Sequence, residues 1–473
     1  FMTKNNIAIP LKTFTLFYAI ISIIYCLVFI TAEFWGSPMA GFQGFMTLFM
    51  QWIVISLAAS SVIGLMTINK WVFAILYPIL IILSSIAAYY KITLGASITP
   101  AVIELAVINN TTTWLTLVSP LLIVIVVISI IISVVIVAYR FKYVHRPKYP
   151  LIWIGVYVLG AVLPIIIPRL RAPVVARMPY SFLWSFKDWH ENRKIISNNR
   201  DTFVNTPVSC HEDSLTVIFV IGESLRPDHL QINGYIRPTT PFLNADTAVI
   251  SISNMRTIPY YTHVSVPHIM TRADSIHPNI ATDEQSFITL FKKARFYTAW
   301  LSNQDETQSY SYFMHEADEL QRINAAKTFY DFSLQLDEDL LPVFDTFIKR
   351  TEPRKLAVIH TIGSHWWYKS HYKPEDAMFK PEINSRIVSE LSTEQMVNSY
   401  DNTIVATDKF LHKIINRLRN LNAILIYISD HGEALGENGH FLHGEDYPEL
   451  HNTASFVWYS SKYAQNTGNL YYI

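Results

Sequence analysis

The sequence predicts a protein in two parts: an α-helical transmembrane domain of five spans, followed by an α/β domain whose mostly parallel sheet is flanked by helices. Five long apolar runs lie in the first part of the chain. From about residue 214 onward, short apolar runs alternate with polar helical stretches, which is the pattern of a parallel sheet. Residue types that bind metals follow several of these runs, as at the carboxyl edge of such a sheet.

The composition indicates a membrane protein. The 473 residues are 51% hydrophobic and only 16% charged, and the formal net charge is zero. A soluble chain of this length is rarely so apolar, and the charge balance gives no reason to expect nucleic acid as a partner. Cys26 lies in an apolar run and Cys210 in a polar one, so we expect no disulfide.

Each apolar run has about the 20 residues that a transmembrane helix needs. We expect the first to be an uncleaved helix, because it is long for a signal peptide and four more runs follow it. Buried helices of a soluble protein do not explain the runs, which are too long and too uniformly apolar. The five spans are placed at 13–32, 45–67, 71–90, 119–139 and 150–168.

Basic residues beside the spans predict their orientation. The loops at about 33–44 and 91–118 carry one cation between them, Lys91. The amino terminus and the other connections carry many, and such loops stay in the cytoplasm. The chain after residue 170 is therefore expected on the other side, which in a bacterium with two membranes is the periplasm. The cytoplasmic cations are Lys4, Lys12, Lys70, Arg140, Lys142, Arg146 and Lys148.

We divide the chain into a transmembrane domain at 1–168, an interfacial amphipathic linker at 169–212 and a periplasmic domain at 213–473. The segment 169–197 interleaves cations with aromatic residues, which favours a helix in the lipid headgroup layer. A plain linker is the alternative. The loop at 91–118 mixes apolar and polar residues and is expected to form a short helix at the membrane surface.

Polar residues follow the predicted strands at the points where the strands end. Because the carboxyl ends of parallel strands meet at one edge of a sheet, these residues are expected to gather there. A long helix is predicted at 394–419, before the last of these strands. Its expected inward residues are Met396, Ile404, Phe410, Ile414, Ile415 and Leu418. The strands lie at 215–221, 299–301, 355–360 and 422–429, and the residues that follow them are Glu223, Asn303, Gln304, His365, Asp430 and His431.

Three of these residues suit a metal ion. Glu223, Asp430 and His431 offer two carboxylates and one imidazole, which fit zinc with an open position for a nucleophile or a substrate oxygen. His443 follows closely enough to reach the same site. His365 and His443 are candidates for a second metal or for a general acid and base. Each histidine alone is more often a surface or core residue, but the combination favours a metal site.

The residue pattern leaves the nucleophile open. Ser224 stands beside Glu223, whereas a hydroxyl at a helix amino terminus and next to the metal would be better placed. The candidates are Ser224, Thr257, Thr262 and Ser265.

Several runs are specific enough to compare with a known family. They resemble the motifs of bacterial phosphoethanolamine transferases, which are membrane enzymes with a sulfatase or alkaline-phosphatase fold. The resemblance covers essentially the whole chain, including the five spans. The runs are Gly-Glu-Ser-Leu-Arg at 222–226, Asn-Gly-Tyr-Ile-Arg-Pro-Thr-Thr-Pro at 233–241, Thr-His-Val-Ser-Val-Pro at 262–267, His-Thr-Ile-Gly-Ser-His at 360–365, Ser-Asp-His-Gly-Glu-Ala-Leu-Gly-Glu-Asn-Gly at 429–439 and Leu-His-Gly at 442–444.

The resemblance implies a role for each site residue. Thr262 is the implied nucleophile, and His365 and His443 would contact the phosphoryl group or a second zinc ion. Asn303 and Gln304 would line the phosphoethanolamine pocket. One tightly bound catalytic zinc ion would be held by Glu223, Thr262, Asp430 and His431.

The resemblance also implies the reaction. Phosphoethanolamine would pass from phosphatidylethanolamine to lipopolysaccharide, at a core sugar or lipid A, or to a related periplasmic glycan, through a phosphoethanolamine-threonine intermediate. The protein would be a monomer of the bacterial inner membrane, in contact with membrane lipids. The alternatives are a lipid-linked phosphoglycerol transferase and a membrane-tethered phosphodiesterase or sulfatase. A transporter would need ionisable residues within its spans, and almost none are present.

The chain departs from the lipid A-modifying members of that family. Cys210 is the only cysteine after the spans, and Ile258 and His268 stand where such members often place a cysteine pair. The stretch 303–310 lacks the lysine of those members. Both differences favour a cysteine-poor branch that acts on core sugars or periplasmic glucans. Since the sequence stops soon after Tyr471, the closing elements of the fold are expected to be short or missing.

Overall fold

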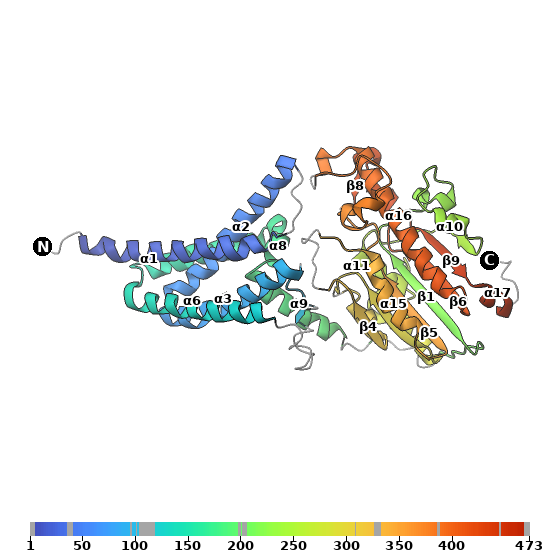
Figure 1. The fold of residues 1–473 in the computed structure, drawn as a ribbon, viewed down its shortest axis with the longest axis horizontal. Coiled ribbons are helices and arrows are strands. Elements are labelled where there is room, and N and C mark those ends of the chain that lie inside the picture. The colour runs from blue at the N-terminus through green and yellow to red at the C-terminus, as the bar shows by residue number, and fades with distance from the viewer. Residues whose placement is uncertain are drawn as a thin grey trace. The chain divides into compact units, whose positions relative to one another are not determined.

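A computed structural model shows how these segments fold (Figure 1). The residues that it describes fall essentially into two compact units, one reaching to His190 and the other from Glu191 onward. The predicted surface helix at 91–118 lies mainly outside the described residues, and so does the end of the chain after 467. The structure describes residues 5–35, 41–94, 97–100, 102–103, 119–196, 200, 206–307, 309–325, 333–385, 388–443 and 446–467.

Long apolar helices build the first unit. Four of the described helices are long and apolar enough to cross a membrane, and there are up to five spans if α7 and α8 count as one bent span. The predicted class of the first part is confirmed. The helices are α1 (Asn5–Tyr25) with its π-helical continuation η1 (Cys26–Ile30), α2 (Gly41–Ile68), α3 (Lys70–Leu94), α6 (Pro120–Tyr143), α7 (Pro150–Ile166) and α8 (Pro168–Val175).

The fifth predicted span, 150–168, is not one straight helix. It breaks after Ile166, and α7 and α8 meet at 101°. Ile167 has an extended backbone, and Pro168 begins the next helix. A residue before proline is driven away from the helical region by the proline ring, which explains why the break falls here.

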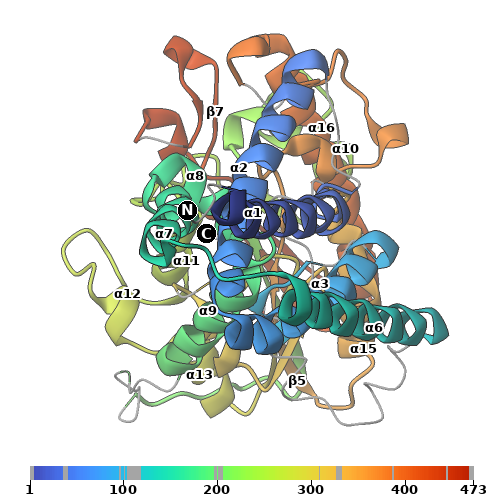
Figure 2. The same ribbon diagram turned by 90° about the vertical axis from the view of Figure 1, so that its left-hand side faces the viewer.

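Small residues let the membrane helices approach closely. A Cβ at Gly64 in α2 would lie 2.6 Å from the ring of Tyr157 in α7. Figures 1 and 2 show α3 and α6 side by side, and the hydroxyls of Ser85 and Ser129 join them at 2.8 Å. Small residues and hydroxyl pairs of this kind hold helices together where no hydrophobic effect drives their association.

The predicted surface segment at 169–197 forms α8 and then α9 (Tyr180–Ile196). Phe182 and Trp184 of α9 pack against the apolar core of the first unit. Leu183 and Phe186 on the same helix are exposed. This helix therefore presents a second apolar surface to its surroundings.

A seven-stranded sheet forms the centre of the second unit, in the order β2-β9-β6-β1-β5-β3-β4. The pairs from β6 through β1, β5 and β3 to β4 are parallel, whereas β9 runs antiparallel to β6 and β2. This confirms the predicted mostly parallel sheet. The strands are β1 (Leu215–Gly222), β2 (Val249–Ser251), β3 (Tyr297–Ser302), β4 (Glu319–Arg322), β5 (Arg354–His360), β6 (Ala423–Ser429) and β9 (Ser455–Tyr459).

Helices flank this sheet (Figure 1). The longest, α16 (Thr393–Leu418), begins with a capping box in which Ser392 accepts from the N–H of Gln395, and the side chain of Gln395 accepts from the N–H of Ser392. Its six predicted inward residues are all buried. The other helices include α10 (Pro241–Ala245), α11 (Thr262–Met270), α13 (Phe287–Lys293), α14 (Ser311–Glu316), α15 (Leu341–Ile348) and α17 (Ser461–Thr467), and β7 (Ala434–Leu435) pairs with β8 (Phe441–Leu442) in a separate ribbon.

Candidate metal centre

The parallel register of the central strands brings two carboxylates together. Gly222 at the end of β1 is the partner of Ser429 at the end of β6. The next residues, Glu223 and Asp430, therefore leave the sheet side by side, and the N–H of Asp430 donates to the carbonyl of Gly222 at 3.1 Å. Adjacent parallel strands place their carboxyl ends at one edge, as the sequence predicts.

Glu223, Asp430 and His431 form a compact group of metal-ligand atoms. Their candidate ligand atoms all lie within 4.8 Å of one another. Nε2 of His431 is 3.4 Å from Oε1 of Glu223 and 3.4 Å from Oδ2 of Asp430. All three side chains are buried. The set of two carboxylate oxygens and one imidazole nitrogen is one that zinc prefers.

Hydrogen bonds aim these atoms toward a common point. Nδ1 of His431 donates to the carbonyl of Gly432 at 2.7 Å, so Nε2 is the nitrogen that faces the carboxylates. Oδ1 of Asp430 accepts from the N–H groups of Ser224 and His431. Oδ2 of Asp430 is buried and accepts no hydrogen bond from any residue that the structure describes. An orphaned carboxylate oxygen at this place is what a metal ligand requires, so the residues fit a zinc ion.

The charges of this group depend strongly on one another. Burial acts to raise the pKa of Glu223, but the hydrogen bond and charge of His431 outweigh it and hold that pKa well below its usual value. Burial, and then the charge of Glu223, raise the pKa of Asp430. Burial lowers the pKa of His431, but Asp430 and Glu223 outweigh it and raise that pKa. Two buried carboxylates thus need a nearby cation.

The hydroxyl of Thr262 lies against this group. Thr262 is the first residue of α11, and its Oγ1 donates to Oε2 of Glu223 at 3.1 Å. The same oxygen is 3.4 Å from Nε2 of His431. Among the four candidate nucleophiles, Thr262 alone combines a place at a helix amino terminus with contacts to two of the three metal-ligand residues. Ser224 also contacts Glu223 but is fully buried, and the buried hydroxyl of Ser265 has no hydrogen-bond partner within the described part of the chain.

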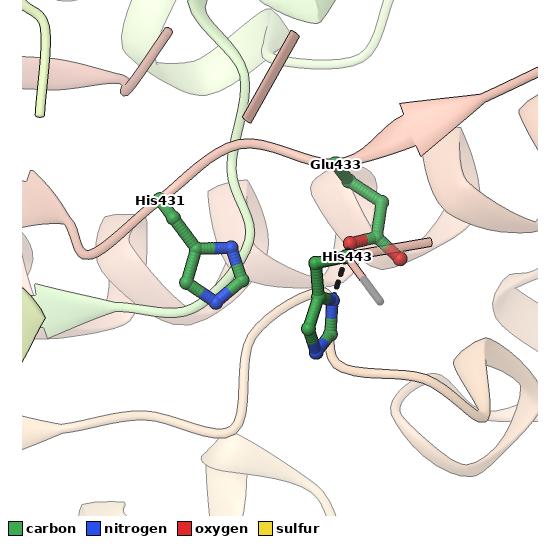
Figure 3. A group of neighbouring side chains, drawn as sticks. All are labelled: His431, Glu433 and His443. Atoms are coloured by element: carbon green, nitrogen blue, oxygen red, sulfur yellow. Dashed lines mark hydrogen bonds and ion pairs between the residues drawn. The ribbon is translucent and has the colours of Figure 1, made fainter. Parts of the chain in front are cut away.

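A second group lies beside the first (Figure 3). Nδ1 of His443 is 2.8 Å from Oε2 of Glu433, and the hydroxyl of Tyr368 donates to the other oxygen of Glu433 at 2.7 Å. The ring centroids of His431 and His443 are 4.8 Å apart. His431, Glu433 and His443 also lie close enough together to hold an ion. Sequence reasoning missed Glu433, although it directly follows the Asp-His-Gly run.

His365 and His443 lie outside the first group, and their pKa values shift in opposite directions. Burial lowers the pKa of His365, whose Nδ1 donates to the carbonyl of Trp366. Burial also acts to lower the pKa of His443, but Glu433 outweighs it and raises that pKa. The ring centroids of His365 and His443 are 6.2 Å apart. Neighbouring groups whose pKa values are pushed apart suit the roles of acid and base.

Gln304 reaches the metal-ligand group, as the sequence predicts for a residue of the site. Its Nε2 donates to Oε2 of Glu223 at 2.9 Å. Its neighbour Asn303 does not point there. Asn303 is 1% exposed, its Nδ2 donates to Asp337 at 2.9 Å, and its Oδ1 accepts from Asn324 at 2.8 Å.

Asn303 acts as a support for the loop after β5. Asp337, which accepts from Asn303, also accepts from the N–H groups of Ile362 and Gly363. These residues lead to His365. The position of Asn303 thus differs from the predicted lining of a pocket, because both ends of its amide are used inside the fold.

A family model described as Sulfatase matches residues 216–472. Among curated proteins, the Kdo(2)-lipid A phosphoethanolamine 7''-transferase of Escherichia coli (strain K12) is 30% identical over 269 residues, which are 54% of this chain and 46% of that protein. The chain thus spans about half the length of the curated relatives it matches. The predicted resemblance to phosphoethanolamine transferases is confirmed.

Two solved structures share the fold. The integral membrane lipooligosaccharide phosphoethanolamine transferase A of Neisseria meningitidis gives a TM-score of 0.51 at 20% identity, over 96% of this chain and 90% of that one. The C-terminal periplasmic domain of EcEptC from Escherichia coli, in a complex with Zn, gives 0.50 at 24% identity, over 55% of this chain and 79% of that one. At these identities the likeness shows the fold.

Proposed function

The chain belongs to the sulfatase family, and on this premise we propose that it transfers phosphoethanolamine from phosphatidylethanolamine to lipopolysaccharide, at a core sugar or lipid A, or to a related periplasmic glycan. One observation carries the proposal. The Thr262 hydroxyl stands at a helix amino terminus, 3.1 Å from Oε2 of Glu223 and 3.4 Å from Nε2 of His431. The names of the relatives, which are phosphoethanolamine transferases, give the transferred group.

Glu223, Thr262, Asp430 and His431 would hold one zinc ion. The unpartnered oxygen of Asp430 and the facing nitrogen of His431 support this assignment. When bound, zinc lowers the pKa of a neighbouring hydroxyl and offsets the charge that develops on phosphoryl oxygens. A relative of the same fold has been crystallised in a complex with Zn.

The first step forms a bond between Oγ1 of Thr262 and the phosphorus of the donor. The bond between phosphorus and the glycerol oxygen breaks, and diacylglycerol leaves. Thr262 loses its proton to solvent as its oxygen attacks, while Oε2 of Glu223 orients the hydroxyl by accepting its hydrogen bond. His443, whose pKa Glu433 raises against burial, gives a proton to the leaving oxygen. Phosphoethanolamine is then held on Thr262 as a covalent intermediate.

The second step returns the site to its starting state. An acceptor hydroxyl or phosphate bonds to the phosphorus, and the bond to Oγ1 of Thr262 breaks. Neutral His443 takes the acceptor's proton, and Thr262 takes up a proton from solvent. His365 and Gln304 would contact the phosphoethanolamine group, since Gln304 already reaches Glu223 and the ring of His365 lies near that of His443.

The membrane unit would bring the lipid donor to this site. We assign 1–168 to the membrane domain, 169–212 to an interfacial linker and 213–473 to the catalytic domain, which would face the periplasm from the inner membrane. The distribution of lysine and arginine between the loops supports this orientation. The exposed Leu183 and Phe186 of α9 support contact with headgroups. The protein would work as a monomer.

Intact mass spectrometry of the purified full chain tests the proposal. We expect zinc-loaded protein incubated with phosphatidylethanolamine to gain one phosphoethanolamine group and to release diacylglycerol. Thr262→Ala should gain nothing, whereas Ser265→Ala, which removes a hydroxyl from the same helix, should still form the adduct. An adduct on Thr262→Ala would identify a different nucleophile. A glycerol phosphate adduct from phosphatidylglycerol instead would make the protein a phosphoglycerol transferase.

A further inference from the structure

The turn that carries Glu223 has a strained backbone. Ser224, directly after this metal-ligand residue, has φ = 56°, in the left-handed region. This region is unfavourable for a residue with a side chain, so the surroundings must hold Ser224 in place. Ser224 is also fully buried, and its hydroxyl donates to Oε1 of Glu223 at 2.9 Å. The conformation of Ser224 therefore sets the position of the Glu223 carboxylate.

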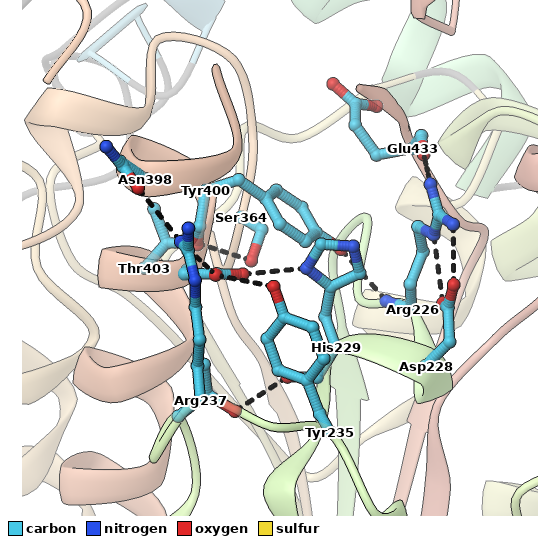
Figure 4. A network of polar contacts seen from close by, with 12 residues as sticks. Arg226, Asp228, His229, Tyr235, Arg237, Ser364, Asn398, Tyr400, Thr403 and Glu433 are labelled. Carbon is cyan, nitrogen blue, oxygen red and sulfur yellow. Dashed lines mark hydrogen bonds and ion pairs between the residues drawn. The ribbon is translucent and has the colours of Figure 1, made fainter. Parts of the chain in front are cut away.

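The hydroxyl of Tyr400 bridges this turn. It donates to the carbonyl of Ser224 at 2.6 Å and accepts from the N–H of Arg226 at 2.9 Å. One side-chain oxygen thus bridges the carbonyl of the strained residue and the N–H of Arg226, two residues further along the chain. Figure 4 shows Tyr400 reaching from α16 toward Arg226. A right-handed Ser224 would turn its carbonyl away and lose this contact.

Tyr400 is itself held rigidly. It is fully buried in α16, and its ring lies 5.3 Å from that of His229 and 5.6 Å from that of Tyr368, measured between centroids. Both contacts are edge-on, which is a favoured aromatic geometry. The hydroxyl is therefore presented at a fixed place by the longest helix of the unit.

The same helix supports the turn from its other side. The hydroxyl of Thr403, one turn along α16, is hydrogen-bonded to the hydroxyl of Ser364 at 2.6 Å. The N–H of Ser364 donates to the carbonyl of Glu223 at 3.0 Å. Gly363 packs so closely that a Cβ there would lie 2.9 Å from the same carbonyl. Residues three apart share one face of a helix. The same face of α16 therefore supports the ligand turn at two points, directly through Tyr400 and by way of Ser364 through Thr403.

We propose that Tyr400 is a positioning residue for the metal centre: its hydroxyl keeps Ser224 left-handed and thereby holds the Glu223 carboxylate in the geometry that zinc needs. The inference rests on the proposed zinc site but not on the transfer reaction. Substitution of a residue that holds a metal-ligating side chain in position typically changes metal affinity 10- to 100-fold.

Zinc affinity of the full chain, measured by competition with a chromogenic chelator, tests the inference. We expect Tyr400→Phe, which removes only the hydroxyl, to weaken zinc binding roughly tenfold. Tyr372→Phe is the matched control, because Tyr372 is also buried in this unit and its hydroxyl donates to Glu382, at 2.7 Å, rather than to the ligand turn. Its zinc affinity should stay close to that of wild type, because the hydroxyl that it loses bonds to Glu382 and not to the turn that carries Glu223.

Ser224→Gly provides a second, independent test. Glycine adopts the left-handed region without cost, so the turn no longer needs the Tyr400 hydroxyl to hold its conformation. Tyr400→Phe should therefore weaken zinc binding much less in the Ser224→Gly background than in wild type. If Tyr400→Phe alone does not fold, the double variant should recover folded protein. Equal, additive losses in the two backgrounds would overturn the inference.

The outcomes separate this inference from the proposed function. Wild-type protein that binds zinc but transfers nothing would end the proposed transfer and leave the role of Tyr400 standing. Equal zinc affinity in wild type and Tyr400→Phe would end the role of Tyr400 and leave the transfer standing. A loss of affinity in Tyr372→Phe as large as that in Tyr400→Phe would show that losing any buried tyrosine hydroxyl weakens zinc binding, and would likewise overturn the inference.

Discussion

Glu433 and His443 form a carboxylate–imidazole pair in which Oε2 of Glu433 lies 2.8 Å from Nδ1 of His443. The carboxylate is fully buried, and its other oxygen accepts from the hydroxyl of Tyr368. Each oxygen of Glu433 therefore accepts one hydrogen bond, one from His443 and the other from Tyr368. It fixes the ring of His443 so that Nε2 is the nitrogen left for substrate, as carboxylates do for metal-binding and catalytic histidines.

Glu433→Gln is expected to lower kcat roughly 10- to 100-fold with little change in KM. A glutamine side chain has one acceptor oxygen and one NH2 donor. Its NH2 group would therefore face a second donor, either the Tyr368 hydroxyl or Nδ1 of His443, and that hydrogen bond would be lost. The matched control is Glu382→Gln, because Glu382 also accepts from a tyrosine hydroxyl, that of Tyr372, at 2.7 Å. Steady-state transfer with both variants checks the prediction. Equal losses in the two would show that Glu433 has no special link to the reaction.

Thr262→Ser should keep transfer within about tenfold of wild type, and Thr262→Ala should lower it by about a thousandfold or more. Serine keeps the hydroxyl that contacts Glu223 and His431 but lacks the methyl group that restricts its rotation. Initial rates of diacylglycerol release measure the effect. Robust release by Thr262→Ala would remove this residue from the reaction.

Asp408 should make the stability of the second unit depend on pH. Its carboxylate accepts from the N–H groups of Phe242 and Leu243 at the start of α10, at 2.9 Å each. Burial raises the pKa of Asp408 from 3.8 to about 6. A raised pKa means that the stabilisation is complete below about pH 4 and is lost as the pH rises through 6, by about 3 kcal/mol at most.

Asp408→Asn removes this titration. The unfolding free energy of wild type should therefore fall relative to that of Asp408→Asn as the pH rises from 4.5 to 7.5. Thermal unfolding of both proteins across this range, in detergent, measures the shift. A difference that stays constant with pH would contradict the raised pKa of Asp408.

Gly64→Ala should destabilise the membrane unit, because its Cβ would lie 2.6 Å from the ring of Tyr157. Forcing an extra carbon into a packed contact costs about 1–3 kcal/mol. Gly155→Ala is the matched control, since in the described part of the chain nothing outside its own helix backbone and its two neighbours lies within 4 Å of the Cβ it would add. It should leave the melting temperature unchanged or raise it, because alanine favours helix. Equal melting temperatures for the two variants would contradict the close packing of α2 and α7.

Much of the architecture was predictable because its signals are local. A span needs only about 20 consecutive apolar residues, and a parallel sheet needs apolar runs that alternate with helices. All six apolar positions predicted to face inward along α16 are buried for the same reason. The break after Ile166 was also signalled, by Pro168, but the angle of 101° depends on how α7 and α8 pack.

The sequence by itself determined that Glu223, Asp430 and His431 would follow strands of one parallel sheet, since strand order along the chain and the common direction of the strands place them at one edge. Only the tertiary structure decided that Gln304 turns to Glu223 while Asn303 turns inward. It alone showed the contact between Tyr400 and Ser224, which are 176 residues apart. Contacts of this kind depend on where a helix packs across the sheet. The residues that neighbour Tyr400 and Ser224 in the sequence do not indicate that position.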